Sequence, residues 1–264
     1  MAMCLVAIAW LCHPRWRLLV AGNRDEFHVR PTAPLRRWPG QAGAPGLLAG
    51  RDLQSGGTWM GLDTLGRAAV VTNVRDGALP GAPPAPGSRG ALPVDYLGGH
   101  QGACERAGSV LDQTAGMAPF NLLLADGNDC CHVGNHPRQA QRVVPGVHVM
   151  SNGRFDQAWP KTRHLGQALE QWLADRTGNP EPLWRALADE RIAADAELPD
   201  TGVGIELERR LSPAFIRGPI YGTRASTLLA VDHQGQGWIS ERRFGPDGEP
   251  QGETSLRNTP HEVT

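Results

Sequence analysis

The sequence predicts an α+β protein in which an antiparallel sheet core is covered by helices. Short apolar runs, paired across turn-like residues, occupy the beginning and the end of the chain, while apolar residues at helical spacing fill its later middle. With 264 residues, of which 40% are hydrophobic, the chain can also bury a large core. We therefore expect a single folded unit over residues 1–264.

Three β-hairpins are expected before the main helical part of the chain. In each of them, two apolar runs flank a short segment of turn-forming residues. The three pairs are residues 5–11 with 18–23, residues 58–62 with 68–72, and residues 120–125 with 129–133. The first two hairpins follow one another along the chain, which favours a meander.

The remaining elements follow from composition and spacing. Residues 76–93 contain five prolines and four glycines, so we expect a surface loop rather than a helix or a central strand. Residues 92–111 have apolar spacing that predicts one or two short helices, and residues 143–150 form a strand broken by Pro145 and Gly146. Helices are predicted over 159–173, 181–188 and 205–211, before a last hairpin of 226–232 with 237–244.

The charge balance bounds the classes of partner. Lysine and arginine together number 26, aspartate and glutamate 27, and the net charge of -1 gives no electrostatic reason to expect nucleic acid or an anionic membrane surface. The first apolar stretch, residues 4–11, is too short to span a bilayer and has no basic segment before it. We therefore expect a cytoplasmic protein without membrane insertion whose partners are small molecules or proteins.

The cysteines predict neither a disulfide framework nor a metal site. The sequence holds five cysteines, an odd number, without CxxC spacing, so reduced thiols are expected. Cys130, Cys131 and His132 are of metal-ligand type, but neighbours on a strand point to opposite faces. His132 and His136 straddle Gly134, which disfavours a helical pair of ligands. We therefore predict no metal.

Four polar clusters lie at the ends of predicted strands. Residues 23–25 follow the second strand, residues 73–75 the fourth, residues 151–153 the strand over 143–150, and residues 223–224 precede the last hairpin. Taken singly, such clusters are usually solvated turns, and a lone strand cysteine such as Cys4 usually packs as a small hydrophobe. Together they predict one shared site at an edge of the sheet.

The motifs at these positions resemble one family throughout the chain. Cys4 close behind the start, "AGNRDEF", "GGTWMGLDTLGRAAVVTNVR", "SNGRFDQAWPKTR" and "YGTRASTLLAVD" resemble the NRDE family, also called the transport and Golgi organisation protein 2 family. That family in turn resembles the N-terminal nucleophile hydrolases. The resemblance implies a four-layer αββα sandwich of two antiparallel sheets.

The same resemblance implies hydrolysis of an amide or acyl bond with no cofactor, and the arginines and tryptophans of the sequence favour a small acidic or amphiphilic substrate. Cys4 would be the nucleophile and its own α-amine the base. Arg24 would favour the thiolate, Asp25 would orient the amine or thiol, and Arg224 would be a second arginine near the nucleophile. Two asparagines would form the oxyanion hole, and the matching positions are Asn73 and Asn152.

Substrate binding is assigned to neighbouring residues of the same motifs, and these are Asn23, Arg75 and Trp59. Guanidinium groups suit a carboxylate or phosphate, while tryptophan suits a flat apolar body. Trp59, like Trp159 and Trp172, is equally typical of a core or a pocket wall.

The first residues leave three alternatives open. Met1, Ala2 and Met3 precede Cys4, and removal of Met1 alone would place the α-amine on Ala2. Either translation begins at Met3, or a tripeptide is removed, or the scaffold has been kept without hydrolysis.

The resemblance also implies haem trafficking as a second function and protein interaction as a third. Haem usually needs an axial ligand, for which the sequence offers His13, Met60, His148 and Met150 without a distinguishing spacing.

Overall fold

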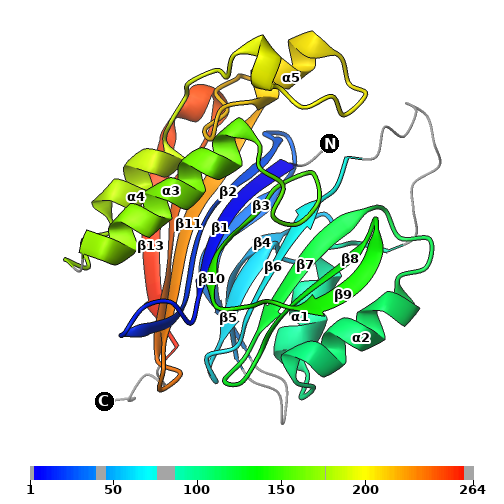
Figure 1. The fold of residues 1–264 in the computed structure, drawn as a ribbon, viewed down its shortest axis with the longest axis vertical. Coiled ribbons are helices and arrows are strands. Elements are labelled where there is room, and N and C mark those ends of the chain that lie inside the picture. Colours follow the sequence, from blue (N-terminus) through cyan, green and yellow to red (C-terminus); the bar gives the residue numbers. More distant parts are fainter. Residues whose placement is uncertain (1–2, 40–45, 76–86, 176, 259–264) are drawn as a thin grey trace.

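Two antiparallel sheets form the centre of the molecule (Figure 1). The computed structural model describes residues 3–39, 46–75, 87–175 and 177–258. The first sheet has six strands in the order β10 (Gly146–Met150), β1 (Met3–Trp10), β2 (Trp16–Phe27), β11 (Tyr221–Asp232), β12 (Gly237–Phe244) and β13 (Pro250–Arg257). The second has seven in the order β3 (Thr32–Trp38), β4 (Leu47–Asp52), β5 (Met60–Asp63), β6 (Ala68–Asn73), β7 (Phe120–Ala125), β8 (Cys130–Asn135) and β9 (Arg138–Arg142).

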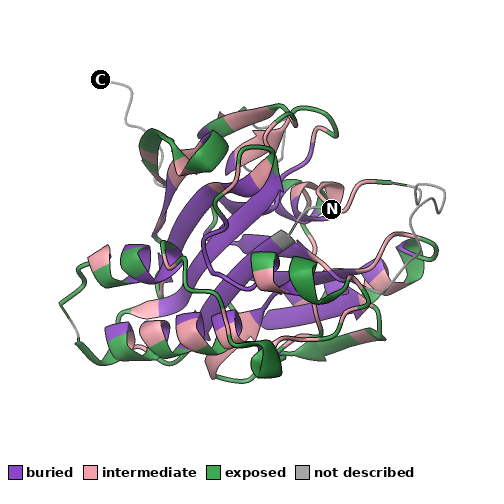
Figure 2. Cartoon of the chain, turned by 90° about the horizontal axis from the view of Figure 1, so that it is seen from above, coloured by how far each residue is buried: buried purple, intermediate pink, exposed green. Residues whose placement is uncertain are grey.

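Helices cover the outer face of each sheet. Helices α3 (Pro160–Asp175) and α4 (Glu181–Leu187) lie on the six-stranded sheet, and α1 (Ala91–Gly98) and α2 (Ala103–Gln113) lie on the seven-stranded sheet. A further short helix, α5 (Ile205–Leu211), follows α4. Figure 2 shows the strands buried while the helices expose their outer sides. The predicted αββα arrangement of two antiparallel sheets is confirmed.

Successive side chains of β1 point alternately into two separate apolar clusters, one on each face of the strand. Val6 and Ile8 belong to the apolar cluster that includes the second sheet, whereas Leu5 and Ala7 pack with the side chains of α3 and α4. Successive side chains of a strand point to opposite faces, so one strand contributes to both layers of packing. Both faces of β1 and β2 are therefore buried, and neither strand alternates between apolar and polar residues in its central part.

The hairpins and helices occur where the sequence predicts them. Four further strands of the structure were not predicted. These four are β3, β4, β9 and β13. β3 carries Pro34 at a register shift and lies at a sheet edge, where the missing amide of proline is tolerated. β9 and β13 are also edge strands with mostly exposed polar side chains, so they lack the apolar run that marks a buried strand.

Three further predictions about elements need correction. The first two hairpins belong to different sheets and form no common meander. The polar residues 23–25 and 223–224 lie inside β2 and β11 rather than beyond them, because both strands are 12 residues long. The predicted loop over 76–93 ends earlier, since α1 already begins at Ala91, and its residues 76–86 lie outside the described residues.

The expectation of reduced thiols throughout is wrong for one pair of cysteines. Cys104 on α2 and Cys131 on β8 form a disulfide, with their Cα atoms 5.3 Å apart. Helix α2 packs directly on β8, so residues 27 apart in sequence come within bonding distance. Cys4, Cys12 and Cys130 are free thiols.

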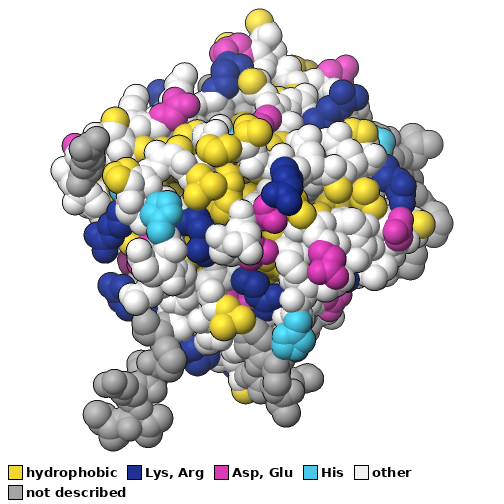
Figure 3. Space-filling view, turned by 60° about the horizontal axis from the view of Figure 1, so that its bottom comes forward, with side chains coloured by type: hydrophobic (Ala, Val, Ile, Leu, Met, Phe, Trp, Pro, Cys, Tyr) yellow, Lys and Arg dark blue, Asp and Glu magenta, His cyan; other side chains and the backbone are white. Residues whose placement is uncertain are grey.

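The surface carries both signs of charge. On the face in Figure 3, basic and acidic side chains alternate among hydrophobic ones, as expected for a sequence with a net charge of -1. Within the described part of the chain, none of the helices has the length and apolar character that crossing a bilayer requires.

Candidate active site around Cys4

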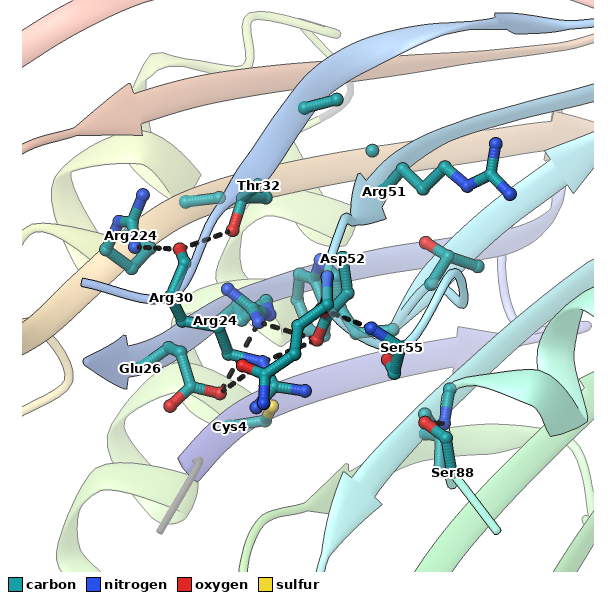
Figure 4. A pocket seen from close by; sticks show the side chains of 18 of the residues that line it. Cys4, Arg24, Glu26, Arg30, Thr32, Arg51, Asp52, Ser55, Ser88 and Arg224 are labelled. Carbon is teal, nitrogen blue, oxygen red and sulfur yellow. Dashed lines mark hydrogen bonds and ion pairs between the residues drawn. The ribbon is translucent and has the colours of Figure 1, made fainter. Parts of the chain in front are cut away.

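Strand pairing places Cys4 directly opposite Arg24. The two residues are register partners on β1 and β2, and both side chains point away from the helices into the space between the sheets. There they line a cavity of about 940 Å³. Figure 4 shows the Cys4 sulfur at this cavity with Arg24 beside it on the neighbouring strand. The convergence of these two predicted residues is therefore observed.

The cavity is rich in arginine. Six arginines and three carboxylate side chains line it, together with Asn73, Trp59 and Thr58. The arginines are Arg24, Arg30, Arg51, Arg89, Arg224 and Arg243, and the acids are Glu26, Asp52 and Glu241. An excess of guanidinium over carboxylate in a partly enclosed space concentrates positive potential there. Such a cavity favours an anionic molecule.

Arg24 is held by long ion pairs. Its Nη2 atom lies 3.5 Å from Oε2 of Glu26 and 3.7 Å from Oδ2 of Asp52, whereas Arg30 takes the shorter contact with Asp52, at 2.6 Å. Its Nη1 atom is buried and has no hydrogen-bond partner among the described residues. Two of the carboxylates therefore orient Arg24 without saturating its five donors.

Arg224 reaches the same cavity through a β-bulge. The register of β11 against β2 shifts between Thr223 and Ala225, so Arg224 is the extra residue whose side chain is re-aimed. Its Nη1 atom donates to the carbonyl oxygens of Phe27, His28 and Arg30, at 3.0 to 3.2 Å. Burial and the nearby charge of Arg24 lower the pKa of Arg224. It therefore holds the turn after β2 and adds positive charge to the cavity.

Asn23 and Asp25 lie on the opposite face of β2. The Nδ2 atom of Asn23 donates to the carbonyl oxygens of Leu187 and Ala214, at 2.8 and 2.7 Å, and its Oδ1 accepts from Ser226. The side chain is fully buried and its bonds are made on the helix side. The structure therefore does not bring Asn23 to the cavity, because alternation turns it away from Arg24.

Asp25 has one satisfied and one unsatisfied oxygen. Its Oδ1 accepts a 2.7 Å hydrogen bond from the hydroxyl of Thr223, while Oδ2 has no partner among the described residues. Burial raises the pKa of Asp25 to about 6, and the charge of Lys161 acts in the opposite direction. Met3 is its register partner on β1, so Asp25 lies beside the peptide bond that precedes Cys4.

The two predicted asparagines meet but line different cavities. Asn152 donates from Nδ2 to the carbonyl oxygen of Asn73 at 2.8 Å, and its own carbonyl accepts from the amide of Arg75. Asn73 lines the cavity of Cys4, whereas Asn152 and Arg75 line a separate one of about 640 Å³ with Trp159. Ser151 connects this loop to β1, because its hydroxyl donates to the Cys4 carbonyl oxygen at 2.8 Å.

The thiol of Cys4 is not activated in this chain. Burial and the charge of Asp25 raise its pKa to about 12, against the opposing effects of Arg24 and Arg89. Its backbone nitrogen is part of a peptide bond, since β1 begins at Met3. A peptide nitrogen cannot accept the thiol proton, so the geometry supplies a thiol with cationic neighbours but no amine base at Cys4.

Comparison with known proteins gives the family. The sequence model of "Transport and Golgi organisation 2" matches residues 3–246. The chain belongs to the Transport and Golgi organisation 2 family. Homologues named Transport and Golgi organization 2 in mouse, cattle and human are 27%, 29% and 28% identical, and each alignment covers 86% of this chain and 86% of the homologue.

A solved structure shares the fold of this family member. It is the Caenorhabditis elegans orthologue of N-acylethanolamine-hydrolyzing acid amidase, with a TM-score of 0.52 over 85% of this chain and 91% of the amidase chain. At 11% sequence identity, this likeness shows the fold alone. The expected likeness to N-terminal nucleophile hydrolases is confirmed at that level.

One residue of this family member was not predicted to belong to the site. Lys161, in the first turn of α3, is 5% exposed, and its Nζ atom donates to the carbonyl oxygen of Leu211 at 2.9 Å. The charge of Asp25 acts on it, and the Cys4 thiol would do so when ionised. The signal that identifies it in the sequence is composition: the chain contains 25 arginines and a single lysine.

Proposed function

We propose that the protein is a cysteine N-terminal nucleophile hydrolase that cleaves an amide or acyl bond in a small anionic molecule. The observation that carries the proposal is the position of Cys4, opposite Arg24 at a cavity with an excess of arginines. The fold shared with an amidase is consistent with this chemistry. The active form in this proposal begins at Cys4, because the mechanism requires a free α-amine there.

The reaction would proceed in two steps. The α-amine takes the proton from the Cys4 thiol, and the sulfur attacks the carbonyl carbon while negative charge develops on the carbonyl oxygen. Collapse of this intermediate breaks the bond to the leaving amine or alcohol, which takes the proton from the α-ammonium. Water then attacks the thioester, with the amine again accepting a proton, and releases the acid and the free thiol.

The residues around Cys4 would divide the work. Arg24, with the help of Arg89, favours the thiolate, and Asp25 orients the amine from the helix side. The amide of Asn73 lines the cavity and would stabilise the oxyanion; Asn152, through its bond to the Asn73 carbonyl, would hold that residue in place. Trp59 would contact the apolar body of the substrate.

The anion of the substrate is a carboxylate or a phosphate, since both match the planar fork of guanidinium. Arg224 and Arg30 would contact it together with Arg24, because all three line the cavity. Arg75 would bind substrate only if the substrate also entered the neighbouring cavity, which Arg75 lines with Trp159.

Hydrolysis of a chromogenic ester tests the proposal. The chain beginning at Cys4, and the Cys4→Ser variant of that chain, are incubated with the 4-nitrophenyl monoester of glutaric acid and with its uncharged methyl diester analogue. We expect turnover that depends on Cys4, a transient acyl-enzyme in the mass spectrum, and a preference for the anionic ester. Equal release by the Cys4→Ser variant would refute the hydrolase.

Haem binding is the second candidate and fits the residues less well. Arginines could pair with propionates, but none of His13, Met60, His148 and Met150 lines the Cys4 cavity in the described chain. Among the described residues that line it, Cys4 alone is of axial-ligand type, and its raised pKa disfavours the thiolate that iron binds. A saturating one-to-one Soret shift that the Cys4→Ser variant loses would reverse this ranking.

A further inference from the structure

The single lysine of the chain, Lys161, is buried. Arginine provides every other basic side chain in the sequence, 25 in all. Its guanidinium stays charged in proteins, whereas a lysine ammonium is a compact charge that can lose its proton when buried. At this one position the sequence therefore places a compact ammonium instead of a guanidinium.

The surroundings of Lys161 are buried and charged. Its Nζ atom is anchored by the carbonyl oxygen of Leu211, at 2.9 Å. The charged groups that act on it are Asp25 on β2, Arg75 after β6 and Glu208 on α5, and the Cys4 thiol on β1 would act on it when ionised. Arg75 and Glu208 neutralise each other at 3.0 Å, which leaves Asp25 as the main counter-charge of Lys161.

Two buried oxygens, one on β2 and one on β11, have no hydrogen-bond partner among the described residues. One is Oδ2 of Asp25 and the other is the hydroxyl of Tyr221, at the start of β11. Burial and the charge of Asp25 both raise the pKa of Tyr221. An unsatisfied buried carboxylate oxygen is costly, so Oδ2 of Asp25 indicates a place for a donor. An amine at Cys4 would lie across from Asp25, in the place of the Met3–Cys4 peptide bond.

We propose that Lys161 is a positioning residue for the α-amine of Cys4 and keeps that amine neutral at working pH. The inference rests on the proposed function and extends it. Asp25 attracts protons to the amine and, alone, would hold it as an ammonium that cannot act as a base. The ammonium of Lys161 offsets this effect, because a nearby like charge lowers the pKa of an amine. Burial lowers the pKa of Lys161 itself to about 8, so it remains mainly protonated at pH 7.

The first experiment measures the α-amine without requiring turnover. The Cys4→Ser chain that begins at position 4 contains two amines, the α-amine and Lys161. Acetylation of the α-amine by acetic anhydride is followed against pH by mass spectrometry, with and without Lys161→Met. We expect the amine pKa to rise by about one unit in Lys161→Met, which slows acetylation about tenfold at pH 6.5 and leaves it unchanged near pH 10. Lys161→Arg, which keeps the charge, should behave like the chain with Lys161.

Superimposable pH curves for Lys161 and Lys161→Met would overturn the inference. So would a shift in Lys161→Arg as large as that in Lys161→Met, because volume rather than charge would then be responsible. If Lys161→Met fails to fold, Lys161 can instead be titrated directly in the protein that retains it. In protein labelled with ¹³C-lysine the side chain gives one signal, which should titrate near pH 8 and move to lower pH in Asp25→Asn. A signal that titrates near 10.4, the value of an exposed lysine, would refute the buried pairing.

The second experiment links the amine to the reaction. With the chain that begins at Cys4, the acid limb of the pH dependence of ester turnover should move to higher pH in Lys161→Met and stay in place in Lys161→Arg. If this chain shows no turnover that depends on Cys4, the proposed function fails while the acetylation curves still decide the role of Lys161. If turnover is present and the acid limb does not move, the inference about Lys161 fails alone.

Discussion

The reactivity of Cys4 should depend on what precedes it. In the chain that begins at Met1, burial and Asp25 raise the pKa of Cys4 to about 12. An ordinary thiol has a pKa of about 8.5, so the thiolate fraction of Cys4 at pH 8 is lower on the order of a thousandfold. Because the thiolate is the reacting species, alkylation should be slower by a similar factor.

A free α-amine at Cys4 should restore most of the lost alkylation rate. General bases accelerate such proton transfers by about a hundredfold or more, so the chain that begins at Cys4 should alkylate at least about a hundredfold faster than the chain that begins at Met1. The assay is a time course with iodoacetamide at pH 8, resolved by peptide mass spectrometry. Cys12 is exposed and serves as the internal reference in each sample, and buried Cys130 serves as the slow one.

Two outcomes would contradict this reasoning. If Cys4 in the chain that begins at Met1 reacts as fast as Cys12, its thiol is not desolvated as its burial indicates. If Cys4 reacts at one rate in both chains, the amine is not its base. The hydrolase proposal would then give way to a binding function on the same fold.

Three further predictions concern stability. Asn23→Ala leaves two buried carbonyls and the Ser226 hydroxyl unpaired, so the free energy of unfolding in urea should fall by about 2 to 4 kcal/mol. An unchanged acylation rate per folded molecule would confirm that Asn23 is no part of the cavity. Glu208→Ala leaves Arg75 buried without its partner and should lower the free energy of unfolding by about 3 to 5 kcal/mol. A second change, Arg75→Met, should restore much of this stability. If it restores none, the buried ion pair is contradicted. Asp25 keeps its proton up to about pH 6 in the folded protein but releases it near pH 3.8 in the unfolded chain. The free energy of unfolding should therefore fall as the pH rises from about 4 to 6. Chemical denaturation of Asp25→Asn should not show this fall.

The sequence predicts the strands that carry apolar runs and misses those that do not. The strands of the buried hairpins could be anticipated from their apolar runs, whereas the division into two sheets was implied only by the family resemblance. β9 and β13 are exposed polar edge strands whose pairing comes from the neighbouring strand rather than from their own side chains. The disulfide between Cys104 and Cys131 was equally hidden, because only the packing of α2 on β8 brings the two thiols together.

Within the site, the sequence predicts which residues gather but not which way each one faces. The central residues of β2 are buried without interruption, so no alternation of apolar and polar types tells the cavity face from the helix face. Asn23 could therefore be assigned to substrate binding, although it bonds to segments beneath the helices. Lys161 went unnoticed because the position of a lysine relative to Asp25 depends on how α3 packs on β1.

The four residues Asn23 to Glu26 serve two sides of one strand. Arg24 and Glu26 face the cavity, where they pair with each other, while Asn23 and Asp25 face the helices, where they bond to Ala214 and Thr223. Changes at Asn23 should therefore appear first in stability, and changes at Arg24 first in the reactivity of Cys4. Asp25 combines the two roles, because it is buried on the helix side and yet lies across from the bond that would become the α-amine. Its effect on rate should therefore depend on the charge of Lys161, and a double-mutant cycle between the two residues should show strong coupling.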